Sequence, residues 1–415
     1  MKTRREFITR VAATALTSAA AVRAAGGRGA DTKKGKILKL AIVGTGQISS
    51  RYLKQGALSQ RARFVATCAR TLESAKARAV EYKIDSWFDD YTKMYDTVKP
   101  DGVVIATPNA LHVAPTLAAF ERGIHVLCEK PMATTWEECQ AMVAAGERSR
   151  LTFLCMPFNG NATFRTAVKY LNEETLGVFT GAESQSFIPG VARDDWYYDS
   201  KQGGGAVFNS LVYSVSRVID LLGPAKRVTG FVNTLIPHRI LGDGAVVHEG
   251  PPPRDAHSAR TTNPTADDNA SLLLEWASGQ QALVRNMWAT SAIFDEDAVI
   301  YGRRGTLWLS GGDLVIHSPE RPIEKAEPVT WNGHKSCYRV SVPETESEGL
   351  IEHFVDCIKG LSAPTCGGPA RLHVHEILFK GIEASRGGQT QALQTTFTPW
   401  HRIEPSFLDS RSGFV

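Results

Sequence analysis

A short glycine-rich stretch near the start of the chain has the residue types and spacing that bind a dinucleotide. The stretch is GTGQIS at residues 44–49, and it follows an apolar run and precedes a segment with helical character. Glycines in such a turn let backbone N–H groups approach a pyrophosphate at the N-terminus of a helix. Ser49 stands where a third Gly or Ala is usual, and an ordinary strand–helix turn is the alternative. The residues predicted to contact the dinucleotide are Gly44, Gly46, Gln47 and Ile48.

The next strand-like segment indicates which dinucleotide is bound. It ends in ATCART, so Ala69 and Arg70 stand where an acidic residue would bind the ribose hydroxyls of NAD. An arginine without that acid suits the 2′-phosphate of NADP. The alternative is that Arg70 is only a solvated surface charge. The sequence therefore favours NADP as the cofactor, with NAD as the second possibility.

Three further motifs resemble those of one enzyme family. IATPNALH (residues 105–112) and GIHVLCEKPMATT (residues 123–135) are similar to motifs of the Gfo/Idh/MocA oxidoreductases, and GGGAVFNSLVY from Gly203 is similar to their substrate-domain helix. The resemblance extends over roughly residues 37–395. It implies a Rossmann domain, a second domain with an open, mostly antiparallel sheet, and an active site between them. The residues that it places at the cofactor are Thr107, Pro108, Asn109, His112, Glu129 and Lys130.

Lys130 is the central catalytic residue that this resemblance implies. A lysine that ends a buried strand beside the cofactor can hydrogen-bond a substrate hydroxyl and stabilise the alkoxide that forms as hydride leaves. Pro131 would set the turn that directs the lysine, and an X–Pro bond of this kind can be cis. The alternative role for Lys130 is a surface ion pair with Glu129.

The substrate-domain helix departs from the pattern D-x-G-x-H-x-x-D of many relatives. Asn209, Leu211, Tyr213 and Ser216 occupy the four places. Tyr213 resembles the general acid/base tyrosine of the branch that contains glucose–fructose oxidoreductase and the dimeric dihydrodiol and xylose dehydrogenases. We expect a phenol whose pKa is lowered by Lys130. The alternative is an aromatic packing residue.

Residues near this helix are expected to bind a carbohydrate. Trp196, in the stretch DDWYYDSKQGGG, could stack on the apolar face of a sugar, or could pack in a core or an interface. Arg193, Asp194 and Asn209 are candidates to bind sugar hydroxyls. The predicted function is an exported oxidoreductase that moves hydride between a hydroxyl-bearing carbon of a sugar or glycoside and a tightly bound NAD(P). The alternatives are redox-assisted cleavage of a glycoside and a cofactor-binding sensor without turnover.

The elements that must position these residues predict an α/β fold in two domains. In residues 36–157, non-alternating apolar runs alternate with helical segments, which is typical of a doubly wound parallel sheet, a Rossmann domain. In residues 158–395, hairpin-like strands with turn glycines predict an α/β domain with an antiparallel sheet. Residues 237–266 are expected to form a long loop, and residues 396–415 a tail. The resemblance further implies a homo-oligomer formed through the second sheet.

The first 24 residues have the composition of a targeting segment. Arg4 and Arg5 precede a short, weakly apolar run rich in Ala and Thr, and small residues follow around Ala24. The arginine pair resembles the twin-arginine signal, which exports folded proteins, and predicts a periplasmic or secreted protein with residues 1–30 as signal and short arm. The alternative is a basic amphipathic first helix.

Charge and hydropathy give no indication of a nucleic-acid or membrane partner. The five basic and one acidic residues of this segment account for the whole formal net charge of +4, so the charge does not argue for nucleic acid. No run of about 18 apolar residues predicts a membrane span, so we expect no stable membrane insertion.

The cysteines and a histidine pair predict no metal site. The seven cysteines show no CxxC spacing, so we expect buried free thiols, although an oxidising compartment permits a disulfide. His373 and His375 in RLHVHE have no third ligand nearby in the sequence. We expect them on exposed faces of a helix.

Overall fold

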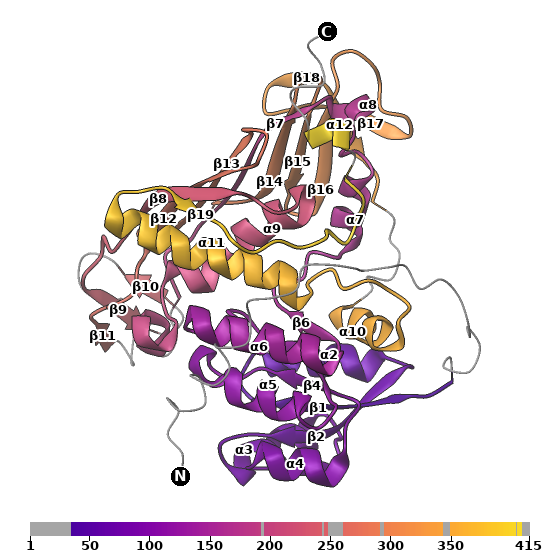
Figure 1. Ribbon diagram of the computed structural model, residues 1–415, viewed down its shortest axis with the longest axis vertical. Coiled ribbons are helices and arrows are strands. Elements are labelled where there is room, and N and C mark those ends of the chain that lie inside the picture. The colour runs from indigo at the N-terminus through magenta and orange to yellow at the C-terminus, as the bar shows by residue number, and fades with distance from the viewer. Residues whose placement is uncertain are drawn as a thin grey trace. The chain divides into compact units, whose positions relative to one another are not determined.

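The computed structural model of the protein describes most of the chain from Gly35 onward. The described ranges are residues 35–191, 195–242, 245–247, 260–290, 294–342, 349–403 and 405–408. Arg4, Arg5, Arg193 and Asp194, which the sequence singled out, lie outside the described residues. The chain from Leu38 onward forms one compact unit, in which a parallel sheet is followed by a larger, mostly antiparallel sheet (Figure 1).

The first sheet has the strand order of a doubly wound dinucleotide-binding fold. Its order is β3-β2-β1-β4-β5-β6, and all pairings are parallel. The strands are β1 (Leu38–Val43), β2 (Ala62–Cys68), β3 (Ser86–Phe88), β4 (Gly102–Ile105), β5 (His125–Cys128) and β6 (Phe153–Cys155). The order reverses between β1 and β4, and sheets of this kind bind ligands at the carboxyl ends of the strands beside that point. The predicted Rossmann domain is confirmed.

Helices cover both faces of this sheet. They are α2 (Ser49–Leu58), α3 (Leu72–Glu81), α4 (Tyr91–Val98), α5 (Val113–Phe120) and α6 (Trp136–Ser149). Successive strand residues point to opposite faces, so Ala41 and Val43 pack with α4, α5 and α6, whereas Leu40 and Ile42 pack with α2 and α3. Burial on both faces explains why the strands read as continuous apolar runs.

The second sheet is mostly antiparallel, as predicted. Its order is β17-β18-β16-β15-β14-β7-β13-β12-β8-β19, and only β7 and β13 pair in parallel. The strands are β7 (Phe179–Phe187), β8 (Arg227–Asn233), β12 (Asn269–Glu275), β13 (Gln281–Met287), β14 (Phe294–Gly302), β15 (Thr306–Ser310), β16 (Asp313–His317), β17 (Ala326–Trp331), β18 (His334–Val340) and β19 (Gln391–Ala392). Burial alternates along β12 and β13, so one face of these strands is buried.

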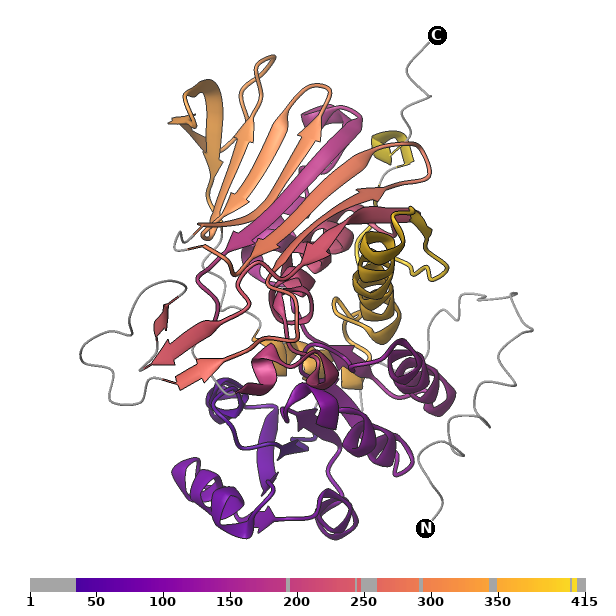
Figure 2. The ribbon, with the colours of Figure 1, turned by 90° about the vertical axis from the view of Figure 1, so that its left-hand side faces the viewer.

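Two long helices pack on the buried face. They are α9 (Val212–Leu222) and α11 (Gly368–Gly387), and Figure 2 shows α11, in yellow, beside the strands. Helix α11 contacts β8, α9 and, in the first domain, α6. Three short helices complete this part: α7 (Ala162–Val168), α8 (Glu173–Leu176) and α12 (Pro405–Leu408).

Part of the expected loop at residues 237–266 is a small sheet instead. Strands β9 (Arg239–Gly242), β10 (Ala245–Val247) and β11 (Arg260–Thr262) pair antiparallel around β9. Arg239 forms a buried ion pair with Asp268 at 2.8 Å and lies over the ring of Tyr198. The prediction of a loop was wrong for these strands, because the partners of Arg239 lie outside the Pro- and Gly-rich stretch and far from Arg239 in the sequence.

Helix α10 (Leu350–Lys359) returns to the first domain. Leu350, Ile351 and Phe354 are buried with Leu40 and the α2 face. Arg61, before β2, pairs with Glu352 and Asp356 of α10. The predicted range 158–395 placed this helix in the second domain, whereas its core contacts are with the Rossmann sheet.

One helical stretch among the described residues is long and apolar enough to cross a membrane by length and composition. It is Ser200–Leu222, which contains an 18-residue window with a mean hydropathy of 1.2, and 83% of that window is buried inside the protein. Val215, Val218 and Ile219 of this stretch belong to the core of the second domain. Its apolar character is therefore accounted for by packing in that core.

The buried thiols match expectation, and the histidines do not. All seven cysteines lie in the described part of the chain, and all are buried and free. His373 and His375 are fully buried, so the prediction of exposed faces was wrong. The reason is that α11 is covered on several sides, by β8, α9 and α6. Within the described ranges no group of three or more His, Cys, Asp or Glu could hold a metal ion.

Candidate active site

The glycine turn after β1 is shaped for close approach of a phosphate. Gly44 has φ +100°, and a Cβ there would lie 2.4 Å from the carbonyl oxygen of Ala106, so only glycine fits. A Cβ on Gly46 would meet nothing within 4 Å, so this backbone faces open space at the N-terminus of α2. Ser49 is buried and donates its hydroxyl to the Gly46 carbonyl at 2.6 Å. This bond accounts for a serine at the third small-residue place.

Side chains around the turn remain accessible to a ligand. The exposed members of the predicted cofactor set are Gly46, Gln47, Ile48, Arg70 and Pro108. Arg78 of α3 was not predicted, yet its guanidinium donates to the Thr45 carbonyl at 3.0 Å and to the Ser50 hydroxyl at 2.8 Å. Arg78 therefore ties α3 to the glycine turn.

The segment after β4 places polar groups at the same edge of the sheet. The hydroxyl of Thr107 is buried and has no hydrogen-bond partner within the protein. His112 is fully buried, and its ring nitrogens lie 2.9 Å from the Thr107 carbonyl and 2.8 Å from the Pro131 carbonyl. Burial lowers the pKa of His112. His112 therefore lies between the end of β4 and the turn after β5, and in its neutral form it donates to one of these two carbonyls.

The turn after β5 presents Lys130. The Lys130–Pro131 peptide is cis. Glu129 is buried, and its carboxylate accepts the Lys130 backbone N–H at 3.0 Å and the phenolic proton of Tyr52 from α2. Burial, followed by the Glu129 charge, raises the pKa of Tyr52 well above its usual value. These contacts fix the backbone of Lys130, and they occupy both oxygens of the Glu129 side chain that was predicted to bind cofactor.

A π-helical turn receives the lysine side chain. Residues Val207–Leu211 form this turn directly before α9. A π turn interrupts the regular i→i−4 bonding of a helix and is frequent at functional sites. The Asn209 carbonyl accepts a hydrogen bond from Lys130 Nζ at 3.0 Å. Lys130 Nζ also lies over the Tyr213 ring, 5.3 Å from its centre. The structure thus brings the two predicted catalytic residues together.

The pKa of Tyr213 shifts in the opposite direction from the one expected. Burial, followed by the negative charge of Glu129, raises it above its usual value. The prediction of a phenol made more acidic by Lys130 was wrong, because desolvation disfavours the phenolate. Tyr213 therefore stays protonated at neutral pH and acts as a hydrogen-bond donor.

Two asparagines connect the two domains near the edge of the first sheet at which the cofactor is predicted to bind. Asn109 donates to the Gly203 carbonyl at 2.8 Å and to the Asn209 side-chain oxygen at 3.3 Å. Asn209 in turn donates to the carbonyls of Gly203 and Gly205 at 3.2 and 3.0 Å. The Asn209 amide therefore holds the glycine turn, and the substrate contact expected of it stays a prediction.

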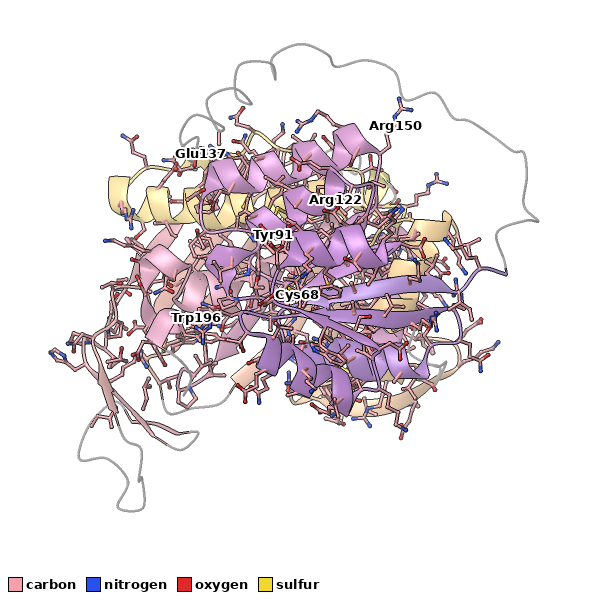
Figure 3. The ribbon with its side chains drawn as sticks, turned by 90° about the horizontal axis from the view of Figure 1, so that it is seen from below. Cys68, Tyr91, Arg122, Glu137, Arg150 and Trp196 are labelled. Carbon is pink, nitrogen blue, oxygen red and sulfur yellow. The ribbon has the colours of Figure 1, made fainter. Side chains whose placement is uncertain are left out.

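An aromatic pair lies beside this turn. Trp196 and Tyr197, in the 3₁₀ turn Asp195–Tyr198, stack with ring centres 3.8 Å apart and are half-buried. The Tyr197 carbonyl accepts the Gly205 N–H at 2.8 Å. In the view of Figure 3, Trp196 lies off the end of the parallel sheet at which Cys68 closes β2. The pair is partly exposed, and its backbone bonds to the same glycine turn that Asn209 bonds.

Comparison with protein families places this geometry in a known context. The model described as "Oxidoreductase family, NAD-binding Rossmann fold" matches residues 38–155, and the "GFO/IDH/MocA C-terminal domain" matches residues 164–308. Together they cover more than half of the chain. The chain belongs to the Gfo/Idh/MocA oxidoreductase family. The predicted family and enzyme class, an NAD(P)-dependent oxidoreductase, are confirmed.

Curated members of the Gfo/Idh/MocA family include similar sequences. The chain is 27% identical over 293 residues to the scyllo-inositol 2-dehydrogenase (NADP(+)) IolU of Bacillus subtilis, which covers 69% of the chain and 78% of that relative. It is 39% identical over 106 residues to the D-glucoside 3-dehydrogenase of Escherichia coli, which covers 25% of the chain and only 30% of that relative. The second match is therefore confined to a minor part of either protein.

A solved family structure shares the fold. A levoglucosan dehydrogenase in complex with NADH and L-sorbose has a TM-score of 0.71, with 19% identity over 86% of this chain and 99% of that one. At this identity the likeness establishes the fold and no more.

The residues at the carboxyl edge of the first sheet fit a nicotinamide dinucleotide. The close approach at Gly44, the open space at Gly46 and the unpartnered buried hydroxyl of Thr107 suit a phosphate-bearing ligand at that edge. When bound, the nicotinamide supplies hydride exchange at its C4 atom. Lys130 and Tyr213 lie at the same edge and supply a cation and a phenolic proton.

Sequence patterns missed the residues that hold this site in place. In the sequence, nothing distinguishes Tyr52 from any other polar aromatic residue on the buried face of a helix. The π turn has no residue signature, and Arg78 resembles an ordinary surface charge. Their partners are Glu129, Lys130 and Thr45, which are distant in sequence, so local spacing carries no signal for them.

Proposed function

We propose that the protein is an exported, NADP-dependent dehydrogenase that oxidises a hydroxyl-bearing carbon of a sugar or glycoside. The observation that carries this proposal is the placement of Lys130 Nζ 3.0 Å from the Asn209 carbonyl and over the ring of Tyr213. This cation and this phenol can meet one substrate oxygen at the cofactor edge. The similar proteins named above are dehydrogenases of an inositol, a glucoside and levoglucosan, all of which carry CH–OH groups.

Lys130 and Tyr213 divide the work on the substrate oxygen. In oxidation the substrate hydroxyl gives its proton to Lys130 in its amine form as hydride leaves the carbon, and in carbonyl reduction the Lys130 ammonium returns that proton. The ammonium also stabilises negative charge on the substrate oxygen. Tyr213, protonated because its pKa is raised, donates a hydrogen bond to the same oxygen in both directions. Glu129, which also bonds Tyr52, keeps the lysine backbone in place, and the buried Asn109 and Asn209 link the two domains nearby.

The aromatic pair gives the site its preference for a ring. Trp196 and Tyr197 present a flat apolar surface beside the glycine turn that Asn209 holds. Sugar rings carry C–H groups on one face, so they can pack on such a surface while their hydroxyls face polar groups. Arg193, three residues before Trp196 and outside the described residues, is proposed as a hydroxyl ligand.

The cofactor is proposed to be NADP. Arg70 is exposed just beyond the end of β2, and the stretch of residues 69–71 contains no acidic residue for a ribose hydroxyl. Its guanidinium can pair with a 2′-phosphate in two parallel hydrogen bonds.

The second sheet is proposed to form a homo-oligomer. Phe231 of β8 is 77% exposed and Leu273 of β12 is 36% exposed on its open face. Apolar side chains of this size on a sheet face favour burial against a second copy. Sedimentation velocity of the wild type and of Phe231→Glu tests this, and a monomeric wild type contradicts it.

Turnover on a panel of sugars and glycosides tests the proposed function. We expect the nicotinamide absorbance of the protein to change when a substrate with a matching CH–OH group is added. Release of an aryl group without net change in that absorbance would instead favour redox-assisted cleavage. Cofactor binding without any turnover across the panel would contradict the proposal.

A further inference from the structure

His375, in the middle of α11, holds the turn that carries Lys130. Its Nε2 atom lies 2.8 Å from the backbone nitrogen of Met132, two residues after Lys130. An amide N–H can only donate, so Nε2 must be the acceptor. The proton is therefore on Nδ1, which donates to the Arg371 carbonyl at 2.7 Å. His375 is fully buried and neutral in one defined tautomer.

Arg371, one helical turn earlier, holds the helix that carries Tyr213. Its guanidinium donates to both carboxylate oxygens of Asp220 at 2.7 Å and to the Pro157 carbonyl at 2.7 and 3.0 Å. Arg371 and Asp220 are both buried, which makes this a costly pair to break. Asp220 follows Tyr213 by two helical turns on α9, so the two lie near the same face of the helix.

Helix α11 therefore makes two contacts within one helical turn, one for each catalytic residue. His375 bonds the turn that carries Lys130, and Arg371 bonds α9, which carries Tyr213. One contact reaches the cis-proline turn of the first domain, and the other reaches α9 of the second domain. A rigid helix between two such contacts fixes their separation. Catalysis by positioned groups is sensitive to that separation, since a misplacement of about 1 Å can cost about a hundredfold in rate.

We propose that α11 sets the distance between Lys130 and Tyr213, and that His375 is the positioning residue for Lys130. His375 acts through the Met132 amide and does not touch the reacting atoms. The expected effect of His375 on kcat rests on the proposed function. Its expected effect on the turn of Lys130 rests on the contacts alone.

The same helix provides a matched control. His373 is also fully buried, and its Nε2 atom accepts a backbone N–H, that of Ala225, at 3.1 Å. Its Nδ1 atom faces the Thr395 hydroxyl at 2.9 Å. Burial lowers the pKa of both histidines to about 4. The two histidines differ in the segment that they contact, because Ala225 lies between α9 and β8, away from Lys130.

Three variants separate positioning from packing. In His375→Leu the Met132 amide loses its acceptor, and we expect kcat to fall by roughly ten- to a hundredfold with little change in KM and in cofactor content. In His375→Gln the amide oxygen can accept from Met132, so most of the rate should return. In His373→Leu we expect a comparable loss of stability but a kcat close to that of wild type. Equal losses of kcat in the two leucine variants would overturn the proposal.

Hydrogen exchange at the Met132 amide provides a readout that needs no substrate. We expect faster exchange at Met132 in His375→Leu and wild-type exchange there in His373→Leu, in which the Ala225 amide should exchange faster instead. Unchanged exchange at Met132 in His375→Leu would overturn the assignment of the turn. If His375→Leu does not fold, His375→Asn replaces it, because its shorter amide does not reach Met132. A wild type that turns over no sugar refutes the proposed function, while the exchange comparison still decides the role of His375.

Discussion

Lys130 Nζ lies over the ring of Tyr213, 5.3 Å from its centre, although the two residues come from different domains. Lys130 lies two residues after the end of β5, and Tyr213 is in the first turn of α9. Asn109 and Asn209 also hydrogen-bond to each other across the two domains. The pairing of Lys130 with Tyr213 gives a cation and a protonated phenol in one place, and it determines what each substitution should do.

Lys130→Met should lower kcat by at least about a hundredfold, the usual size of a lost acid/base or charge-stabilising contribution. The side-chain length is retained, and the backbone N–H can still donate to Glu129, so the turn should persist. The measurement is single-turnover hydride transfer with the cofactor content determined beside it. The exposed Lys93→Met is the control. A folded Lys130→Met with near-normal kcat contradicts the catalytic assignment.

Tyr213→Phe should remove a hydrogen-bond donor. It should leave the alkaline limb of the pH–rate profile unchanged, because the wild-type phenol is not expected to cause a loss of rate there. Because burial and Glu129 raise the pKa of Tyr213 above its ordinary value of 10.0, the wild-type phenol stays protonated throughout the neutral range. The rate of carbonyl reduction should therefore show no loss from this group below that pH. The checks are pH–rate profiles of both proteins and an ultraviolet titration of the tyrosines. An alkaline limb well below pH 10.0 that vanishes in Tyr213→Phe would show a lowered pKa instead.

The sequence predicted the elements that carry their own local signal. Position 44 requires glycine, because its φ is positive and the Ala106 carbonyl lies close to it. Such a glycine turn after an apolar strand is visible in the sequence. The apolar runs of β1 and β4 are equally visible, because both faces of a parallel sheet are buried. Motif resemblance was needed to select Lys130 and Tyr213, since a lysine after a strand and a tyrosine in a helix have many other roles.

Features that depend on distant partners could not be predicted. The direction of the Tyr213 pKa shift depends on burial and on Glu129, and neither follows from the residues near position 213. His375 resembled a surface histidine because its partner, Met132, lies on another domain. β9 was hidden for the same reason, since Arg239 is stabilised by Asp268 and Tyr198 rather than by its sequence neighbours.

Arg70→Ala should erase a preference for NADP over NAD. Arg70 is exposed at the carboxyl end of β2, and loss of its guanidinium removes a charged partner of the 2′-phosphate. Affinities of cofactor-free protein for both dinucleotides provide the measurement. Arg63→Ala, an exposed arginine within β2, is the matched control and should leave the ratio unchanged. Equal affinities in the wild type would refute the assignment of NADP.

Acid should destabilise the protein between pH 6.5 and about pH 4. Burial lowers the pKa of His353, His373 and His375 from 6.5 to about 4. In this window the unfolded chain binds protons at these histidines and the folded chain does not, so stability falls as pH falls and is fully present above pH 6.5. Each histidine contributes a slope of up to about 1.4 kcal/mol per pH unit.

Urea unfolding of wild type and His353→Gln across this window checks the acid prediction. Carboxylates also titrate there, so the difference between the two proteins isolates the histidine. We expect a shallower pH dependence in the variant. Parallel curves would mean that His353 does not remain neutral in the folded state.

The last prediction joins the N-terminal arginines to the cofactor. Outside the cytoplasm there is no pool of free NADP, so an exported dehydrogenase must carry its cofactor and regenerate it in place. The twin-arginine route moves folded proteins and suits that need. Replacement of Arg4 and Arg5 by Lys should therefore trap the precursor inside the cell, as cell fractionation would show.

The mature protein should keep its cofactor through prolonged dialysis and turn over without any added. The proposed holding groups are the turn at Gly44 and Gly46 and the loop of Asn109 and His112, where Asn109 donates to the Gly203 carbonyl of the second domain at 2.8 Å. Retention implies a closed cycle, in which one substrate reduces the cofactor and its product or a second substrate reoxidises it. Absorbance and mass of the dialysed protein measure retention, and Asn109→Ala should weaken it. If dialysis strips the cofactor from the wild type and activity then requires added NADP, the closed cycle is wrong.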